Sequence, residues 1–100
     1  MIARILQGVM KMSSQNRELQ TQEIKNIIQN QGQANLGGTD FKLNNPTHND
    51  SNLQAIVNAP NFTSRVLGTP TQDGVQTYEL NGNGNSIKVN ITSRNSGQNN

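Results

Sequence analysis

His48 is the only histidine in the chain, and it lies in the segment Pro46-Thr47-His48-Asn49-Asp50, directly before a predicted short helix. Histidine is the one side chain that ordinarily changes charge near neutral pH, so an imidazole in a loop can take up and release protons during a reaction. A lone loop histidine also commonly serves as a surface or capping residue. Both interpretations stay open from the sequence alone.

Cationic side chains on the predicted strands would provide the phosphate-binding groups that must accompany a proton-transferring histidine. Cleavage of RNA without a metal needs a proton shuttle for the 2′-hydroxyl and the leaving oxygen, and cations that hold the phosphate. We therefore take His48 as a candidate general acid/base, with Arg65 and Lys88 as candidate phosphate-holding groups. Further hydrogen bonds to phosphate or sugar would come from five residues: Thr47, Ser64, Tyr78, Thr92 and Arg94.

Each of these residues also has an ordinary structural interpretation. Strand cations such as Lys88 and Arg94 commonly provide solubility and protect sheet edges from aggregation. For Tyr78 the favoured structural interpretation packs the ring against the core and leaves the hydroxyl in water. The sequence does not decide between these interpretations.

Other kinds of site are excluded by residue type. The chain has no cysteine, which removes disulfides, thiolate zinc sites and thiol nucleophiles. A single histidine is too few for a histidine-based metal site, and no phosphate-binding loop or dinucleotide fingerprint is present. We therefore expect no metal and no cofactor.

The composition is that of one small, amide-rich domain. The 100 residues include 17 Asn and 11 Gln, and 22 residues are Leu, Ile, Val or Phe. This apolar content lies just above the range of disordered chains, so we expect a folded domain with little stability to spare. The net charge of +2 permits a nucleic-acid partner without requiring one.

Helical spacing dominates the first part of the chain. Apolar residues recur at helical intervals over 2–10 and again over 19–28, where Thr21 is the predicted N-cap and Gly32 the predicted stop. Residues 29–40 are rich in amides and glycine and are predicted to form a loop. Asp50 or Ser51 is expected to cap a short helix that ends before Pro60.

Strands follow the helices. Phe41 and Leu43 predict a short strand or an anchored loop, and strands are expected over 62–67, 75–80 and 86–92, with a hairpin at Asn81-Gly82-Asn83-Gly84. Segregated helices and strands predict an α+β domain over 1–94, in which N-terminal helices pack on a three- to four-stranded antiparallel meander. Residues 95–100 are predicted to form a flexible polar tail.

The first twelve residues do not read as a targeting or membrane segment. Arg4, Gln7 and Gly8 interrupt the apolar run, which is too short to cross a bilayer. We expect neither a signal peptide nor a membrane anchor.

The helices-then-sheet order, the small size and the single histidine resemble a known family. The similarity is carried by Thr47-His48, by Phe62-Thr63-Ser64-Arg65 and by the terminal hairpin from Gly74 to Thr92. These features are similar to C-terminal toxin domains of bacterial contact-dependent growth inhibition systems, in the barnase/EndoU/colicin/RelE-like group of ribonucleases. The resemblance covers about the last two-thirds of the chain.

The resemblance implies metal-independent cleavage of RNA, with transfer RNA among the candidate targets. It also implies a cognate immunity protein, and in some members a translation factor such as elongation factor Tu. Such a domain would be secreted or delivered from a cell surface and would act in the cytoplasm of a target bacterium. This chain differs from that family in its net charge of +2, since these nucleases are often more basic.

The competing hypothesis is a non-enzymatic interaction module, such as an immunity protein or a phage or secretion-system component. Apolar helical stripes suit helix docking, and a β-hairpin offers an edge for strand addition. Geometry distinguishes the two hypotheses. The enzyme requires His48 and at least one of Arg65, Lys88 or Arg94 around one cleft.

Overall fold

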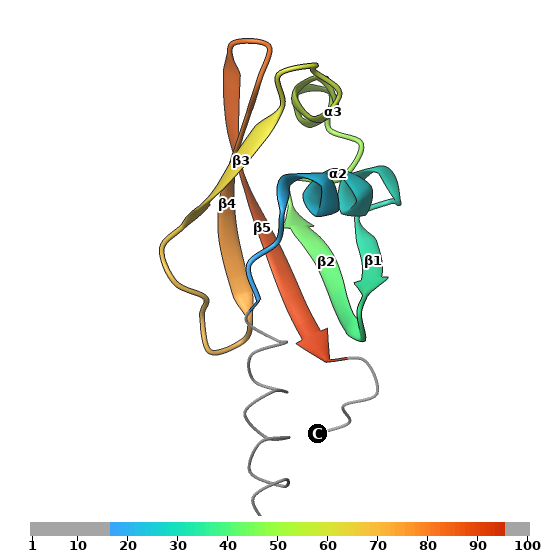
Figure 1. The fold of residues 1–100 in the computed structure, drawn as a ribbon, viewed down its shortest axis with the longest axis vertical. Helices are drawn as coiled ribbons and strands as arrows, with labels where there is room; N and C mark the ends of the chain where they lie inside the picture. Colours follow the sequence, from blue (N-terminus) through green and yellow to red (C-terminus); the bar gives the residue numbers. More distant parts are fainter. Residues whose placement is uncertain (1–16, 96–100) are drawn as a thin grey trace, which may run out of the picture.

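The computed structural model describes residues 17–95, so the predicted helix over 2–10 and most of the predicted tail lie outside the described residues. Two helices and five strands follow one another along this part of the chain (Figure 1). In order they are α2 (Thr21–Gln29), β1 (Gln33–Leu36), β2 (Thr39–Asn45), α3 (Ser51–Val57), β3 (Thr63–Leu67), β4 (Val75–Gly82) and β5 (Asn85–Asn95). Asn95, predicted to open the tail, is the last residue of β5.

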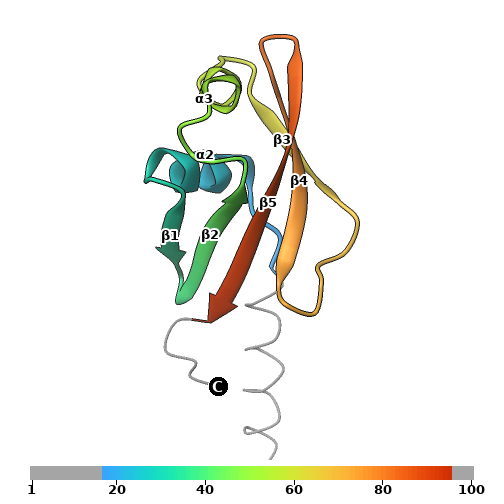
Figure 2. The same cartoon turned by 180° about the vertical axis from the view of Figure 1, so that it is seen from behind.

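The predicted α+β class is confirmed, with a sheet that is larger than expected. The strands of residues 17–95 form one five-stranded antiparallel sheet in the order β1-β2-β5-β4-β3. The strands predicted over 62–67, 75–80 and 86–92 form the expected antiparallel meander, as β3, β4 and β5, and β2 and β1 extend the sheet beyond the three or four strands predicted. The last of these strands, β5, lies in the centre, between β2 and β4 (Figures 1 and 2).

The strand missed by the sequence is β1, which falls in the predicted loop over 29–40. Its residues alternate between exposed and half-buried, with only Ala34 and Leu36 facing the core, so its apolar signal is weak. Gly37 and Gly38 do not simply break the chain. They form the two-residue turn between paired Leu36 and Thr39, with φ of 62° and 88°. Two positive φ values are what a tight hairpin of this kind requires.

The N-cap of helix α2 lies one residue earlier than predicted. Gln20 is the N-cap, and Thr21 is the first helical residue. The reason is a reciprocal cap, in which the Glu23 carboxylate reaches back to accept the backbone N–H of Gln20 at 2.9 Å. The hydroxyl of Thr21 instead forms a hydrogen bond with that of Ser64 on β3, at 2.6 Å.

Helix α3 matches its prediction. The side chain of Asp50 accepts the backbone N–H of Leu53 at 3.0 Å, which satisfies one of the free donors at the helix start. The helix ends at Val57, before Pro60. The predicted hairpin at 81–84 is also confirmed between β4 and β5, with Asn83 and Gly84 at positive φ between paired Gly82 and Asn85.

One face of the sheet carries the core. Residues that alternate along β4 and β5 are buried there with the apolar sides of α2 and α3, among them Tyr78, Leu80, Val89 and Ile91. Helix α2 contacts β1, β2 and β3, and α3 contacts β4 and β5, so both helices lie on this face. No element within residues 17–95 covers the other face, which we call the open face (Figure 2).

Candidate functional site

The open face is built from the polar half of each strand's alternation. On β5 the exposed or half-buried positions Lys88, Asn90, Thr92 and Arg94 point opposite to the buried Val89 and Ile91. A strand must place successive side chains on opposite faces, so a buried apolar set dictates a polar partner set. The open face is therefore mainly a surface of amides, hydroxyls and charges, with Leu67 of β3 and Val75 of β4 as its apolar members.

Hydrogen bonds between strands hold this surface in place. Thr77 on β4 donates through its hydroxyl to Asn90 at 2.8 Å, and the Asn44 amide donates to the Thr92 hydroxyl at 2.5 Å. Asn44 reaches Thr92 because the β2–β5 register shifts between Leu43 and Asn45, which leaves Asn44 as an extra residue on β2. Such a bulge commonly re-aims a side chain.

A shallow groove crosses the β1-β2-β5 part of the molecule. Its lining includes Gln33 from β1, Lys42 and Asn44 from β2, and Thr92 and Arg94 from β5. In the sheet register Lys42 on β2 lies opposite Gln33 on β1 and opposite Thr92 on β5. These three side chains therefore form one row across three strands. The groove brings together two cations, Lys42 and Arg94, and one carboxylate, Asp40, which lies opposite Arg94 in the sheet register, among uncharged hydrogen-bonding groups.

A second pocket contains His48 and continues the groove. Thr47, His48 and Asn49 line it together with residues around the end of α2. It shares Gln33, Lys42 and Asn44 with the first groove, so the two are adjoining parts of one surface. We call the combined surface the His48 groove.

The loop that carries His48 is anchored at both sides. The side-chain amide of Gln54 on α3 donates to the carbonyl oxygen of His48 at 2.7 Å. On the other side the ring lies over Gly32, where an added Cβ would be 3.4 Å from the Cβ of His48 and 3.7 Å from its Nδ1. Gly32 has φ of 84°, so this close packing depends on a position that suits glycine.

Four of the predicted site residues line the His48 groove: Thr47 and His48 line one of its two adjoining pockets, and Thr92 and Arg94 line the other. The structure adds Lys42, which the sequence prediction missed. The signal was available, since Lys42 lies between the buried Phe41 and Leu43 and must therefore face the open side. Its position next to Thr92 depended on the register between β2 and β5, which the sequence does not reveal.

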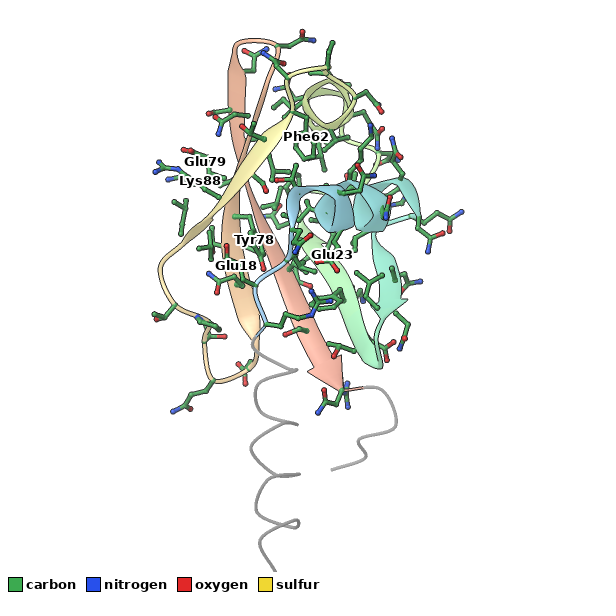
Figure 3. The ribbon with its side chains drawn as sticks, in the orientation of Figure 1. Glu18, Glu23, Phe62, Tyr78, Glu79 and Lys88 are labelled. Carbon is green, nitrogen blue, oxygen red and sulfur yellow. The ribbon has the colours of Figure 1, made fainter. Side chains whose placement is uncertain are left out.

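Arg65 and Lys88 are not among the residues that line the His48 groove. The guanidinium of Arg65 donates to Glu79 at 2.7 Å, and Glu79 lies opposite Lys88 in the sheet register (Figure 3). The hydrogen bond with Glu79 raises the pKa of Arg65, and the same bond lowers the pKa of Glu79. These residues form a separate charged cluster over β3, β4 and β5.

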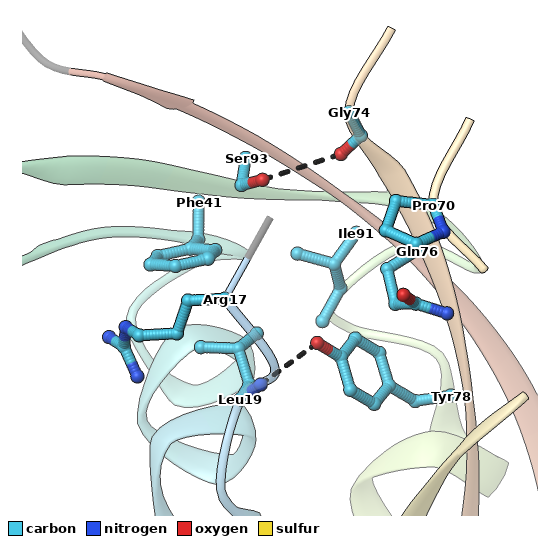
Figure 4. A pocket seen from close by; sticks show the side chains of 9 residues that line it. All are labelled: Arg17, Leu19, Phe41, Pro70, Gly74, Gln76, Tyr78, Ile91 and Ser93. Atoms are coloured by element: carbon cyan, nitrogen blue, oxygen red, sulfur yellow. Dashed lines mark hydrogen bonds between the residues drawn. The ribbon is translucent and has the colours of Figure 1, made fainter. Parts of the chain in front are cut away.

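Ser64 and Tyr78 lie on the helix-covered face, on the other side of the sheet. Ser64 contacts Thr21 at the start of α2. Tyr78 is 2% exposed, and its hydroxyl oxygen accepts the backbone N–H of Leu19 at 3.0 Å beside a cavity of about 10 Å³ (Figure 4). Burial raises the pKa of Tyr78. The core interpretation of its ring is confirmed, but the hydroxyl, which was expected in water and as a substrate-binding group, is buried and bonded to Leu19.

Two other kinds of feature are absent from residues 17–95. No group of three or more histidine, cysteine, aspartate or glutamate side chains is placed to hold a metal ion there. No helix in the described part of the chain is long and apolar enough to span a membrane.

Comparison with known proteins adds no relative. No protein-family model, no curated protein and no solved structure matches the chain.

Proposed function

We propose that the chain binds RNA along the His48 groove and cleaves it without a metal, with His48 as general acid/base. Two adjoining pockets support this proposal, because Gln33, Lys42 and Asn44 line both of them. His48 lines one pocket together with Lys42, and Thr92 and Arg94 line the other. An imidazole beside a cation supplies the proton acceptor and the positive charge that such cleavage needs.

In this proposal the residues of the groove have separate chemical roles. His48 accepts the proton of a 2′-hydroxyl as that oxygen attacks phosphorus, and returns a proton to the leaving 5′-oxygen. Lys42 and Arg94 hold the phosphate and the charge that develops on it. Thr92, Asn44 and Gln33 supply hydrogen bonds to sugar and phosphate. Lys42 takes the phosphate-binding role that the sequence prediction gave to Arg65 and Lys88.

The proposed biological role, RNA target and protein partners follow from the family resemblance. The domain would act as a toxin in the cytoplasm of a target bacterium, with transfer RNA as one candidate target and a translation factor as one candidate helper. A cognate immunity protein would neutralise it by covering the His48 groove.

The test is incubation of the purified full chain with total bacterial RNA in EDTA, beside His48→Ala and Lys42→Gln variants. We expect discrete fragments from the wild type, none from His48→Ala, and at least about tenfold slower cleavage by Lys42→Gln. Lys25→Gln is the matched control, because it removes the same charge from α2 on the covered side. Equal cleavage by His48→Ala would reject the proposed role of His48.

A non-enzymatic interaction module is the second candidate. It is favoured by the two edge strands β1 and β3, each of which pairs with a neighbour on one side only in the described sheet. A free edge can accept a strand from a partner. Absence of cleavage by the wild type, repeated with cell extract to supply any helper protein, would favour this candidate over the ribonuclease.

A further inference from the structure

We propose that the open face binds double-helical RNA, so that the substrate is a stem–loop whose stem docks on the sheet while an unpaired nucleotide reaches His48. This inference rests on the proposed function, and it names the substrate class. Three observations carry it: where the aromatic rings lie, how charge is divided between the faces, and where His48 lies relative to the open face.

All three aromatic rings of the chain pack in the core or against it. The chain has one Tyr, two Phe and no Trp. Tyr78 and Phe41 are 2% and 1% exposed, and Phe62 packs against the core cluster. Proteins that read single-stranded RNA stack its bases on exposed aromatic side chains, at about 1–3 kcal/mol per base. The open face has no Tyr, Phe or Trp ring for this, so it lacks the main means of holding a single strand.

Charge is divided between the open face and the rest of the described surface. The open face carries four cations and two carboxylates, and everything else within residues 17–95 carries two cations and four carboxylates. The open-face set is Lys42, Arg65, Lys88, Arg94, Asp40 and Glu79. Residues 17–95 are therefore neutral in sum, with an excess of two positive charges on the open face. A polyanion would be drawn to this face and repelled from the other.

The uncharged groups of the open face suit the outside of an RNA helix. Duplex RNA presents 2′-hydroxyls and phosphates across a wide, shallow minor groove, and proteins recognise it mostly through these. Amides and hydroxyls such as Gln33, Asn90 and Thr92 can both donate to and accept from a 2′-hydroxyl. Strand β5 alone extends this surface over roughly 36 Å, at about 3.3 Å per residue.

His48 lies at the border of this surface, in the loop between β2 and α3. Attack by a 2′-hydroxyl requires that it align with the leaving oxygen, and regular stacking in a duplex prevents that alignment. Cleavage must therefore occur at an unpaired nucleotide. A stem on the sheet and a flexible loop at His48 satisfy both requirements.

The test uses the full-length His48→Ala chain, which can bind RNA without cutting it, with His48→Gln as a second variant should the first fail to fold. The probes are a fluorescent RNA hairpin, a single strand with the same loop sequence and length, a blunt RNA duplex and a DNA duplex of the same sequence. We expect the hairpin to bind at least about tenfold more tightly than the single strand. The RNA duplex should displace the hairpin, and the DNA duplex should do so far less well.

Variants assign the binding to the open face. Lys42→Gln and Arg94→Gln, each added to His48→Ala, should weaken hairpin binding by about threefold to tenfold, and Lys25→Gln should leave it unchanged. Equal or tighter binding of the single strand, or equal competition by the DNA duplex, would overturn stem recognition. Cleavage by the wild type would in that case still support the proposed function. Absence of both binding and cleavage of any RNA would instead overturn the proposed function, and this inference with it.

Discussion

The backbone N–H of Leu19 donates a hydrogen bond of 3.0 Å to the hydroxyl oxygen of Tyr78, across 59 positions of sequence (Figure 4). Both residues are buried, at 4% and 2% exposure. The bond joins the segment before α2 to the middle of β4, and it satisfies a backbone donor that has no access to water. A buried donor without a partner is costly, so this hydroxyl has a structural role.

Tyr78→Phe should destabilise the fold by about 1–2 kcal/mol, because it leaves the Leu19 N–H unpaired while keeping the ring in place. Urea unfolding followed by circular dichroism measures the loss. Thr77→Val is the matched control, since it removes one hydroxyl hydrogen bond from the half-buried open face of the same strand. A smaller loss in Tyr78→Phe than in the control would contradict the role given to the Tyr78 hydroxyl.

Alkaline pH should destabilise the wild type through the same residue. The folded pKa of Tyr78 is raised by burial above the unfolded value of about 10. Between these two values the unfolded chain releases a proton that the folded chain retains, so stability is full below about pH 10 and falls as pH rises above it. Because this is the chain's only tyrosine, its phenolate absorbance reports the titration directly. Tyr78→Phe should not show this part of the alkaline loss, and an identical slope in both proteins would reject the assignment.

Gly82→Ala should cost about 2–3 kcal/mol, for steric reasons. An added Cβ would lie 2.5 Å from the carbonyl oxygen of Ile56 and 3.0 Å from the Cβ of Ala59, so β4 and α3 would have to separate. Gly84→Ala provides the contrast, because space around it is open and its only penalty is a φ of 76°. That penalty is about 1 kcal/mol. If thermal unfolding shows the two variants to be equal, close contact at Gly82 does not limit the packing of α3.

Acid should weaken the start of α2. The hydrogen bond from Arg17, at 2.9 Å, lowers the pKa of Glu23. Glu23 therefore contributes stability above its unfolded pKa of about 4.3, and this contribution is lost as pH falls through the lower folded value. Glu23→Gln should be less stable than the wild type near neutrality by about 0.5 kcal/mol and should converge with it in acid. Glu18→Gln is the charge control, and parallel pH curves for wild type and Glu23→Gln would contradict the prediction.

Gln54→Ala should slow the proposed cleavage of RNA more than it weakens RNA binding. Its side-chain amide holds the carbonyl oxygen of His48 at 2.7 Å, and a misplaced general base loses rate through geometry. We expect kcat to fall by about tenfold with KM nearly unchanged. Gln54→Glu cannot donate this bond and should behave like the alanine variant. A change confined to KM would show that Gln54 affects binding and not the position of His48.

Local signals in the sequence predicted the parts of the fold that depend on neighbours in the chain. The Asp50 cap of α3 and the turn at Asn83-Gly84 are both set by residues a few positions apart, and both were found. The alternation around Val89 likewise predicted which side of β5 faces the core. Such features need no knowledge of what packs against them.

Features that depend on pairing between distant strands were not predicted. Strand β1 has too few apolar residues to be recognised until β2 pairs with it. The neighbourhood of Lys42 and Thr92 depends on the β2–β5 register, across a bulge that no short pattern marks. Ser64 and Arg65 are adjacent in sequence, yet they lie on opposite faces of the sheet, so a site that combined them needed a face assignment that the sequence prediction lacked.

The central place of β5 has a consequence for how the chain folds during synthesis. The β1–β2 hairpin and the β3–β4 hairpin share no ladder with each other, and each pairs with β5. While the ribosome has released residues up to 84, the two halves have no strand to join them. The Lys42–Thr92 neighbourhood cannot exist before residues 85–95 emerge. Sheet closure and completion of the His48 groove by Thr92 and Arg94 are therefore a single late event, so the nascent chain lacks its full binding surface until β5 has been released.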